Sequence, residues 1–298
     1  MASRVTQSML NTQLIHNLNK NMVRMDNSQN QLATGRRINK PSDDPVGISY
    51  SMRYRSELAA NTQYHENVDS AISWLEHADT TADQVGNLFQ RIRELAVKGA
   101  NGTNPQIALN AIASEVEQLQ NQLITLGNSQ FNGKYVFNGQ MTDIQPYSEV
   151  DPASDTADNG KIVFEIGVGV KIAVNVSGNT IFGSPTDADN TFKMMSDLHT
   201  ALITGDFAGI DTAIGQLDTR VNKFLEVRAD IGAKVNRIQL SEERLKDINI
   251  NLQQMLSKTE DADMAELITK LKTDEAVYQA SLSVGSRIIR PSLIDFLR

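Results

Sequence analysis

The sequence predicts a mainly α-helical protein: a long antiparallel helical bundle or coiled coil built from both chain ends, with a small β-rich domain in the middle. The first observation is the position of the seven prolines, which leaves four long stretches free of this helix-breaking residue. The second is that apolar residues in these stretches recur at alternating steps of three and four, as on one helix face. The third is a change of composition at 134–182, where β-branched residues alternate with a period of two.

The two chain ends carry thin apolar stripes on otherwise polar segments. Because ordering one residue costs roughly 1–2 kcal/mol of backbone entropy, neither end should be well ordered alone. The ends could pair with each other as a coiled coil, or both could dock on the same chain's bundle, and the pattern leaves both alternatives open. The stripe residues are Ile15, Leu18, Met22, Met25 and Leu32 at the N-terminal end, and Met264, Ile268, Leu271, Tyr278, Leu282 and Ile289 at the C-terminal end.

The stretches between the ends carry the apolar series expected of long bundle helices. Such helices are not stable on propensity alone, so they must bury their stripes against one another. A rod-like antiparallel bundle is the simplest arrangement that does this. The clearest series are Leu109, Ile112, Val116, Leu119, Leu123 and Leu126, and Phe207, Ile210, Ile214, Leu217, Val221 and Phe224.

The middle segment has strand and turn patterns. Strands are predicted at 161–166 and 168–176, and Asn132-Gly133 is a turn dipeptide. Gly167 and Gly169 are interpreted as a bulge or tight bend. A phosphate-binding loop is the weaker interpretation, because an isoleucine stands where G-x-G-x-x-G needs its last glycine.

The composition excludes several function classes. The chain has 298 residues and a net charge of −8, which argues against binding to nucleic acid or to an anionic membrane surface. Cysteine is absent, so the chain has no disulfide framework, thiol nucleophile or thiolate metal site. No run of about 18 apolar residues predicts a membrane span, and the first ten residues lack the apolar region of a secretory signal.

Residues that could carry catalysis or bind metal are sparse. His65 begins an H-E pair, but Asp69 stands where an H-E-x-x-H zinc motif needs its second histidine. The carboxylate pairs at 43–44 and 261–263 favour helix capping over Ca²⁺ binding, with Asp43 as the expected cap before Pro45. We therefore predict no catalytic, cofactor-binding or metal site and no enzymatic activity.

Three segments, however, carry motifs of a known family. They are Leu32–Gly47 (LATGRRINKPSDDPVG), Arg228–Arg237 (RADIGAKVNR) and Asp261–Leu267 (DADMAEL). In this order and at these distances from the chain ends, they resemble the N- and C-terminal helical regions of the bacterial flagellin superfamily. In that family a long helix ends at the T-G pair, an extended turn follows, and D-D-P begins the next helix.

The physical chemistry of the first segment agrees with this resemblance. A glycine suits a helix break, prolines prevent the helix from continuing, and either aspartate can cap the helix that follows. The residues of this family-signature turn are Gly35, Pro41, Asp43, Asp44 and Pro45.

Within the superfamily, three features resemble the L-type hook-associated proteins of the hook–filament junction more than flagellin. The turn reads Lys40–Pro45 (KPSDDP), where flagellins usually carry alanines. The β-rich segment opens with Asn132–Gly139 (NGKYVFNG), similar to an N-G-x-Y-x-F-x-G motif of the junction proteins. The end, Arg290–Leu297 (RPSLIDFL), resembles their P-S-L-x-D-F-L tail.

The resemblance implies a structural subunit of the bacterial flagellum. It implies export through the flagellar type III system without a cleaved signal peptide, and folding of both termini during assembly outside the cell. The expected partners are further copies of the chain in the flagellar tube, the adjoining hook-associated protein, flagellin and an export chaperone, with no cofactor, nucleic acid or membrane. The β-rich module would project outward and tune the junction between a curved hook and a stiff filament.

The resemblance and the apolar stripes together suggest an assembly interface and domain boundaries. The expected interface residues are Leu18, Met22, Met25 and Leu32, facing Leu271, Tyr278, Leu282 and Ile289. The expected segments are 1–44 (N-terminal assembly helix and turn), 45–133 (bundle, first part), 134–185 (β-rich outer module), 186–260 (bundle, second part) and 261–298 (C-terminal assembly helix).

Three other functions remain as alternatives. The first is flagellin itself, the subunit of the filament. The second is a secreted enzyme with its chemistry in the β-rich module, and the third is a cytoplasmic coiled-coil scaffold.

Overall fold

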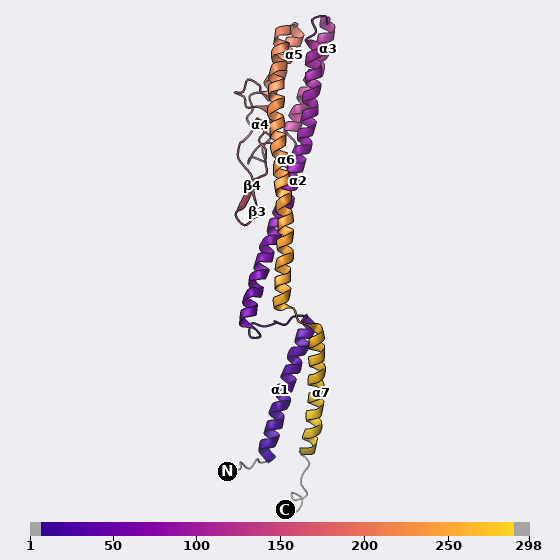
Figure 1. Ribbon diagram of the computed structural model, residues 1–298. Helices are drawn as coiled ribbons and strands as arrows, with labels where there is room; N and C mark the ends of the chain where they lie inside the picture. Colours follow the sequence, from indigo (N-terminus) through magenta and orange to yellow (C-terminus); the bar gives the residue numbers. More distant parts are fainter. Residues whose placement is uncertain (1–6, 289–298) are drawn as a thin grey trace, which may run out of the picture. The chain divides into compact units, whose positions relative to one another are not determined.

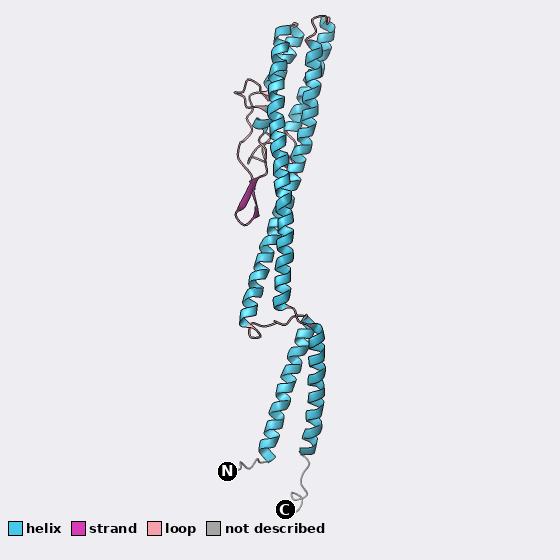
Figure 2. Cartoon of the chain, in the orientation of Figure 1, coloured by secondary structure: helices cyan, strands magenta, loops and turns pink. Residues whose placement is uncertain are grey.

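The computed structural model describes residues 7–288, and most of these are helical (Figures 1 and 2). Long helices with small β hairpins between them confirm the predicted fold class. The helices of this range are α1 (Gln7–Thr34), α2 (Pro45–Gly99), α3 (Gln106–Gly127), α4 (Gly178–Phe182), α5 (Thr191–Thr204), α6 (Phe207–Glu260) and α7 (Met264–Ile288).

The chain divides into two compact units, described separately here. One comprises Met1–Ala60 and Ile248–Arg298, and the other comprises Asn61–Asp247. The division falls inside α2 and α6, so each of these helices contributes to both units.

The larger unit is built around the predicted apolar stripes. The rings of Phe89 on α2 and Phe224 on α6 meet edge to face, with their centroids 5.5 Å apart. Gly86 permits this approach, because a Cβ there would lie 3.2 Å from the Phe224 ring. Arg228 interrupts the apolar series of α6 and pairs instead with Asp79 and Asp83 on α2, at 3.6 and 3.2 Å. The stripe residues buried in this core include Leu109, Ile112, Val116, Leu123, Ile210, Leu217 and Phe224.

The middle segment contains two antiparallel hairpins. Strands β1 (Gln130–Phe131) and β2 (Lys134–Tyr135) are joined by Asn132-Gly133, both with positive φ, as a tight hairpin turn requires. Strands β3 (Val163–Gly167) and β4 (Val170–Ala173) form the second hairpin. Its register shifts between Glu165 and Gly167, and Gly169 has φ +72°, so the predicted bulge and bend are confirmed.

Strand β4 is shorter than the predicted strand 168–176 at both ends. Val168 and Gly169 form the turn of the hairpin, and the side chain of Asn175 explains the early C-terminal end. Its Oδ1 accepts a hydrogen bond of 2.8 Å from the N–H of Ile162, and its Nδ2 donates one of 2.7 Å to the carbonyl of Gly160. An amide side chain thus takes the place of the backbone pairing that would have extended the strand.

Candidate assembly surface

Helices α1 and α7 pack side by side in the terminal unit (Figure 1). The two predicted end segments therefore pair with each other. The seam between them is partly polar, since Asn21, Ser28 and Asp274 are all buried in it. Arg24 lies 3.4 Å from Asp274 and donates a hydrogen bond of 2.5 Å to Asn21. A seam of this kind buries little apolar surface, so it stabilises the pair only weakly.

The predicted interface residues fall on two sides of this pair. Leu18, Met25 and Leu32 of α1 and Leu271 and Tyr278 of α7 are half-buried. Met22 is 53% exposed and Leu282 is 47% exposed, so both face outward. Ile289 lies outside the described residues.

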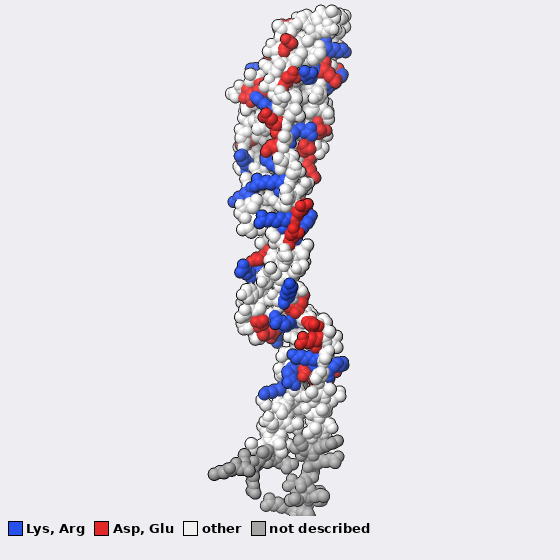
Figure 3. All heavy atoms as spheres, viewed as in Figure 1, with Lys and Arg blue, Asp and Glu red and all other residues white. Residues whose placement is uncertain are grey.

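The outward faces of α1 and α7 carry many large apolar side chains and few charges. Residues 7–19 and 276–286 contain no Lys, Arg, Asp or Glu. In Figure 3 the visible surface of these helices is accordingly white, except near the C-terminal end of α1 and the N-terminal end of α7. The exposed apolar residues are Met9, Leu10, Ile15, Met22, Val23, Met264, Ile268, Val277, Leu282 and Val284. Exposed apolar side chains with few charges among them are typical of a protein contact site.

The ends of α1 and α6 are joined by backbone hydrogen bonds between the two connecting segments, which we call the elbow (residues 35–44 and 261–263). Gly35 ends α1 with φ +71°, and its carbonyl accepts a hydrogen bond of 3.1 Å from Ala262. The N–H of Arg37 donates one of 2.7 Å to the carbonyl of Glu260. These bonds satisfy backbone groups that a helix end leaves free.

Glu260 is the central side chain of the elbow. It is only 3% exposed, although it ends a helix whose dipole disfavours a negative charge there. Its carboxylate accepts a hydrogen bond of 3.1 Å from Ser51, pairs with Arg36 at 3.2 Å and contacts Arg55 closely. Donors from α2 and from the 35–44 connection therefore converge on one buried carboxylate, which satisfies its charge.

The five residues of the signature turn end α1, close the connection 35–44 or begin α2. Asp44 caps α2, because its Oδ1 accepts a hydrogen bond of 2.9 Å from Gly47, and Pro45 is the first residue of that helix. The expectation that Asp43 provides this cap is wrong. Its Oδ2 instead accepts hydrogen bonds from the N–H groups of Asn39 and Lys40, which closes the turn before Pro41. Gly35 ends α1, as described above.

The second carboxylate pair, Asp261 and Asp263, lies just before α7 and accepts hydrogen bonds from nearby residues. Asp263 Oδ1 accepts hydrogen bonds of 2.9 and 3.1 Å from Ala265 and Glu266. Asp261 accepts one of 2.5 Å from the hydroxyl of Ser257. Both carboxylates are thus engaged as caps or local acceptors.

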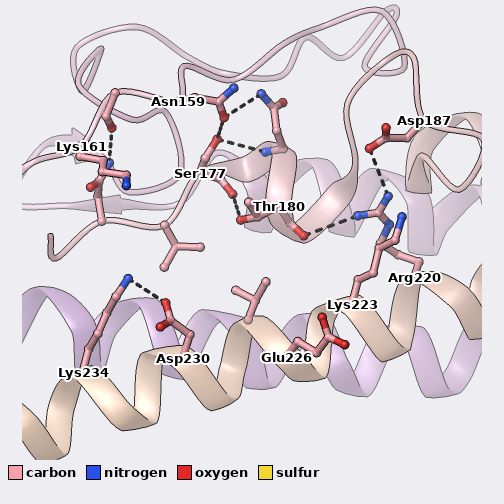
Figure 4. A pocket seen from close by; sticks show the side chains of 15 residues that line it. Asn159, Lys161, Ser177, Thr180, Asp187, Arg220, Lys223, Glu226, Asp230 and Lys234 are labelled. Atoms are coloured by element: carbon pink, nitrogen blue, oxygen red, sulfur yellow. Dashed lines mark hydrogen bonds and ion pairs between the residues drawn. The ribbon is translucent and has the colours of Figure 1, made fainter.

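A groove of about 630 Å³ lies in the larger unit, between residues 159–180 and α6 (Figure 4). Arg220 lies at one end of this groove and is only 2% exposed. Its Nε donates a hydrogen bond of 2.9 Å to the backbone carbonyl of Asp189, and its Nη2 lies 2.9 Å from the side-chain carboxylate of Asp189. Burial opposes ionisation of Asp189, but the hydrogen bond from Lys223 and the charge of Arg220 outweigh it and lower its pKa. These ion pairs fasten the middle segment to α6, and the described groove contains no nucleophile paired with a base.

Two further features concern ions and membranes. Within residues 7–288, one group of three side chains brings possible metal-ligand atoms within 4.8 Å of one another: His65, Asp69 and Glu242. Among the helices of the same range, none combines the length and hydrophobicity that a membrane crossing requires.

Comparisons with known proteins identify the family to which this architecture belongs. A family model for the bacterial flagellin N-terminal helical region matches residues 5–142, and one for the flagellin C-terminal helical region matches residues 212–297. The chain belongs to the bacterial flagellin family, a family of structural, non-enzymatic proteins of the flagellum.

The relatives within this family are of two kinds. Flagellar hook-associated protein 3 of Escherichia coli is 26% identical over 273 residues, which cover 84% of this chain and 86% of that protein. A flagellin of Halalkalibacterium halodurans is also 26% identical, over 269 residues, with 89% and 88% covered.

Solved structures of junction proteins share the fold. Bacillus cereus FlgL is 18% identical with a TM-score of 0.59, over 69% of this chain and 99% of that one. The flagellar junction protein FlgL of Legionella pneumophila is 15% identical with a TM-score of 0.59, over 71% and 100%.

Proposed function

We propose that this protein is an L-type hook-associated protein (FlgL), a structural adaptor of the hook–filament junction. In this role it joins the hook, through the adjoining hook-associated protein, to the flagellin filament. The structural likeness to FlgL proteins and the three junction-type motifs of the sequence support this choice.

One observation carries the assembly role: residues 7–19 of α1 and 276–286 of α7 are uncharged and expose apolar side chains. Residues 7–19 and 276–286 lack charged residues, whereas surfaces that stay in water normally carry many. Protein interfaces are depleted of charge at their centres and enriched in apolar groups. Packing of neighbouring copies against these faces would bury side chains that the isolated pair leaves in water.

The predicted interface residues take two roles in this proposal. The half-buried Leu18, Met25, Leu32, Leu271 and Tyr278 would stabilise the pairing of α1 with α7. The exposed Met22 and Leu282, and Ile289 outside the described residues, would contact neighbouring copies in the tube. Because the seam of one pair is partly polar, much of the ordering entropy would be offset only by contacts between subunits.

The proposal includes an export route and a site of assembly for the chain. The chain would be exported by the flagellar type III system with the help of a chaperone and without a cleaved signal peptide. It would then assemble as a homo-oligomer outside the cell, between the adjoining hook-associated protein and flagellin.

Flagellin is the second candidate, and one observation favours it. The identity to the H. halodurans flagellin equals the identity to hook-associated protein 3 of E. coli. In that case the chain would form the filament itself.

Immunogold labelling of flagella distinguishes the two candidates. An epitope inserted at Val150, which is 95% exposed in a loop, should be tolerated and remain accessible. A junction protein gives label only at the distal end of the hook, and its deletion leaves hooks without filaments. Label along the whole filament would replace the junction proposal with flagellin, and a flagellum without label would contradict both.

A further inference from the structure

A histidine of α2 lies against carboxylates of two helices in the larger unit. His65 and Asp69 are four residues apart on α2, and their Nδ1 and Oδ2 atoms are 3.2 Å apart. Glu242 reaches the other ring nitrogen from α6, with Oε1 3.9 Å from Nε2. One possible ligand atom from each of the three residues lies within 4.8 Å of the other two.

This spacing suits a shared ion better than direct bonding across the helices. The distance of 3.9 Å is too long for a hydrogen bond. In a tetrahedral zinc site, with bonds of about 2.0–2.2 Å, neighbouring ligand atoms are about 3.3 Å apart. The two carboxylates face different ring nitrogens, so one ion can be shared only if the imidazole turns or one carboxylate rotates towards the nitrogen that binds it. Asp69 is exposed and His65 and Glu242 are half-buried, which leaves these side chains room to rotate.

A positive charge already occupies this place. The ammonium group of Lys246 contacts the carboxylate of Glu242 closely. Lys246 is exposed, so it can swing into water and leave Glu242 to another cation. The lysine therefore marks where a cation is favoured and competes with any ion that binds there.

We propose that His65, Asp69 and Glu242 form a binding site for a divalent transition-metal ion, best suited to Zn²⁺. One imidazole nitrogen and two carboxylates supply three ligands, which leave the fourth tetrahedral position to water. The two carboxylates balance the charge of the ion. Because the ligands come from α2 and α6, the bound metal clamps these helices together within the larger unit.

Isothermal titration of the full-length, tag-free chain with ZnCl₂, in a buffer without chelators, tests the proposal. We expect saturable binding of one Zn²⁺ per chain. The substitutions His65→Gln, Asp69→Asn and Glu242→Gln each remove a ligand and should each weaken binding at least roughly tenfold, because loss of even an outer-shell partner costs about 10- to 100-fold. Substitution of Co²⁺ should give the visible absorption bands of a tetrahedral site.

A gain-of-affinity variant keeps the test independent of any loss of folding. Lys246→Ala removes the competing cation and should tighten Zn²⁺ binding several-fold. Lys234→Ala is the matched control, because this lysine pairs with Asp230 on the same helix at 2.8 Å in the same i,i+4 arrangement. His199→Gln, on α5, controls for the loss of a histidine.

The outcomes that overturn the proposal are equally definite. They are the absence of saturable binding, or binding whose affinity is the same in His65→Gln, Glu242→Gln and the wild type. An equal gain of affinity in Lys246→Ala and Lys234→Ala would also overturn it, because the effect would then come from overall charge.

Discussion

The carboxylate of Glu260 accepts a hydrogen bond of 3.1 Å from the hydroxyl of Ser51, a residue that precedes it by 209 positions. Arg36 and Arg55 converge on the same carboxylate from the 35–44 connection and from α2. The elbow thus depends on one buried acidic side chain with partners from distant parts of the sequence. This dependence can be tested by a single substitution.

The substitution Glu260→Ala should loosen the elbow. It leaves Ser51, Arg36 and Arg55 without their shared acceptor, and hydrogen bonds to charged groups contribute about 1.5–3 kcal/mol. Hydrogen–deuterium exchange should quicken in residues 35–44 and 261–263. Glu57→Gln is the control, since Glu57 is exposed and pairs with nearby Arg53 on the same helix. Equal exchange in both variants would contradict a special role for Glu260.

The substitution Leu282→Asp should block assembly and leave the folded chain intact. Leu282 is 47% exposed, so the change should alter the free energy of unfolding by less than about 0.5 kcal/mol. In an assembled tube, the same charge would be buried at a contact between copies, which is costly. Swimming and electron microscopy of cells provide the measurement. Ser283→Asp is the matched variant, because it adds the same charge at the neighbouring exposed position without removing an apolar side chain. Normal flagella in the Leu282→Asp strain would refute the interface.

The substitution Gly183→Ala should destabilise the larger unit by about 1–3 kcal/mol. Gly183 has φ +92° and ψ 149°, a conformation that residues with a Cβ avoid. An added Cβ would also lie 2.9 Å from the Cα of Asn190 and 2.6 Å from Arg220. Urea unfolding gives the change in stability. Gly232→Ala, in an α6 position with open space around it, should instead stabilise by up to about 1 kcal/mol.

The substitution Asp189→Asn should cost stability at neutral pH and cost less in acid. Asp189 has a lowered pKa because Lys223 and Arg220 outweigh its burial. The folded state therefore binds fewer protons than the unfolded state, and the stabilisation is present above about pH 4 and lost as pH falls through the folded pKa. Urea midpoints should differ at about pH 7 and converge towards about pH 3. A difference independent of pH would show that the carboxylate charge is not involved.

Limited proteolysis of the purified chain should remove both ends together. The partly polar seam between α1 and α7 stabilises them weakly, whereas the larger unit has an apolar core. Mass spectrometry should find a resistant fragment near residues 45–260. Resistance of the full chain would mean that the termini are well ordered before assembly, and would contradict folding coupled to assembly.

The sequence predicted the long helices, the strands of the second hairpin, the turn at Asn132-Gly133 and the position of the signature turn, because each has a local pattern. It did not predict Glu260, whose partners lie far away along the chain, although an acidic residue at a helix C-terminus conflicts with the helix dipole and could have drawn attention. Arg220 also escaped notice. It stands beside Leu217 and Val221 in an apolar series, where a charge is unusual and here indicates a buried ion pair.

The choice between Asp43 and Asp44 as the cap could not be made from the sequence, since both are acidic and precede Pro45. Only the path of the turn, which aims Asp43 at the N–H groups of Asn39 and Lys40, separates their roles. The shorter β4 has a similar cause, because the amide of Asn175 replaces backbone pairing that sequence periodicity cannot distinguish.

A hydrogen bond of 3.0 Å from Asn61 Nδ2 to the carbonyl of Leu245 joins the beginning of the larger unit to a residue near its end. The chain enters Asn61–Asp247 and leaves it at two positions that touch, so this segment is topologically an insertion into the terminal unit. It follows that the segment could be exchanged for that of a relative by two cuts, with both terminal helices and the elbow left unchanged. The two junctions, before Asn61 and after Asp247, are therefore sites at which natural variation or protein engineering could replace the larger unit while the terminal helices stay the same.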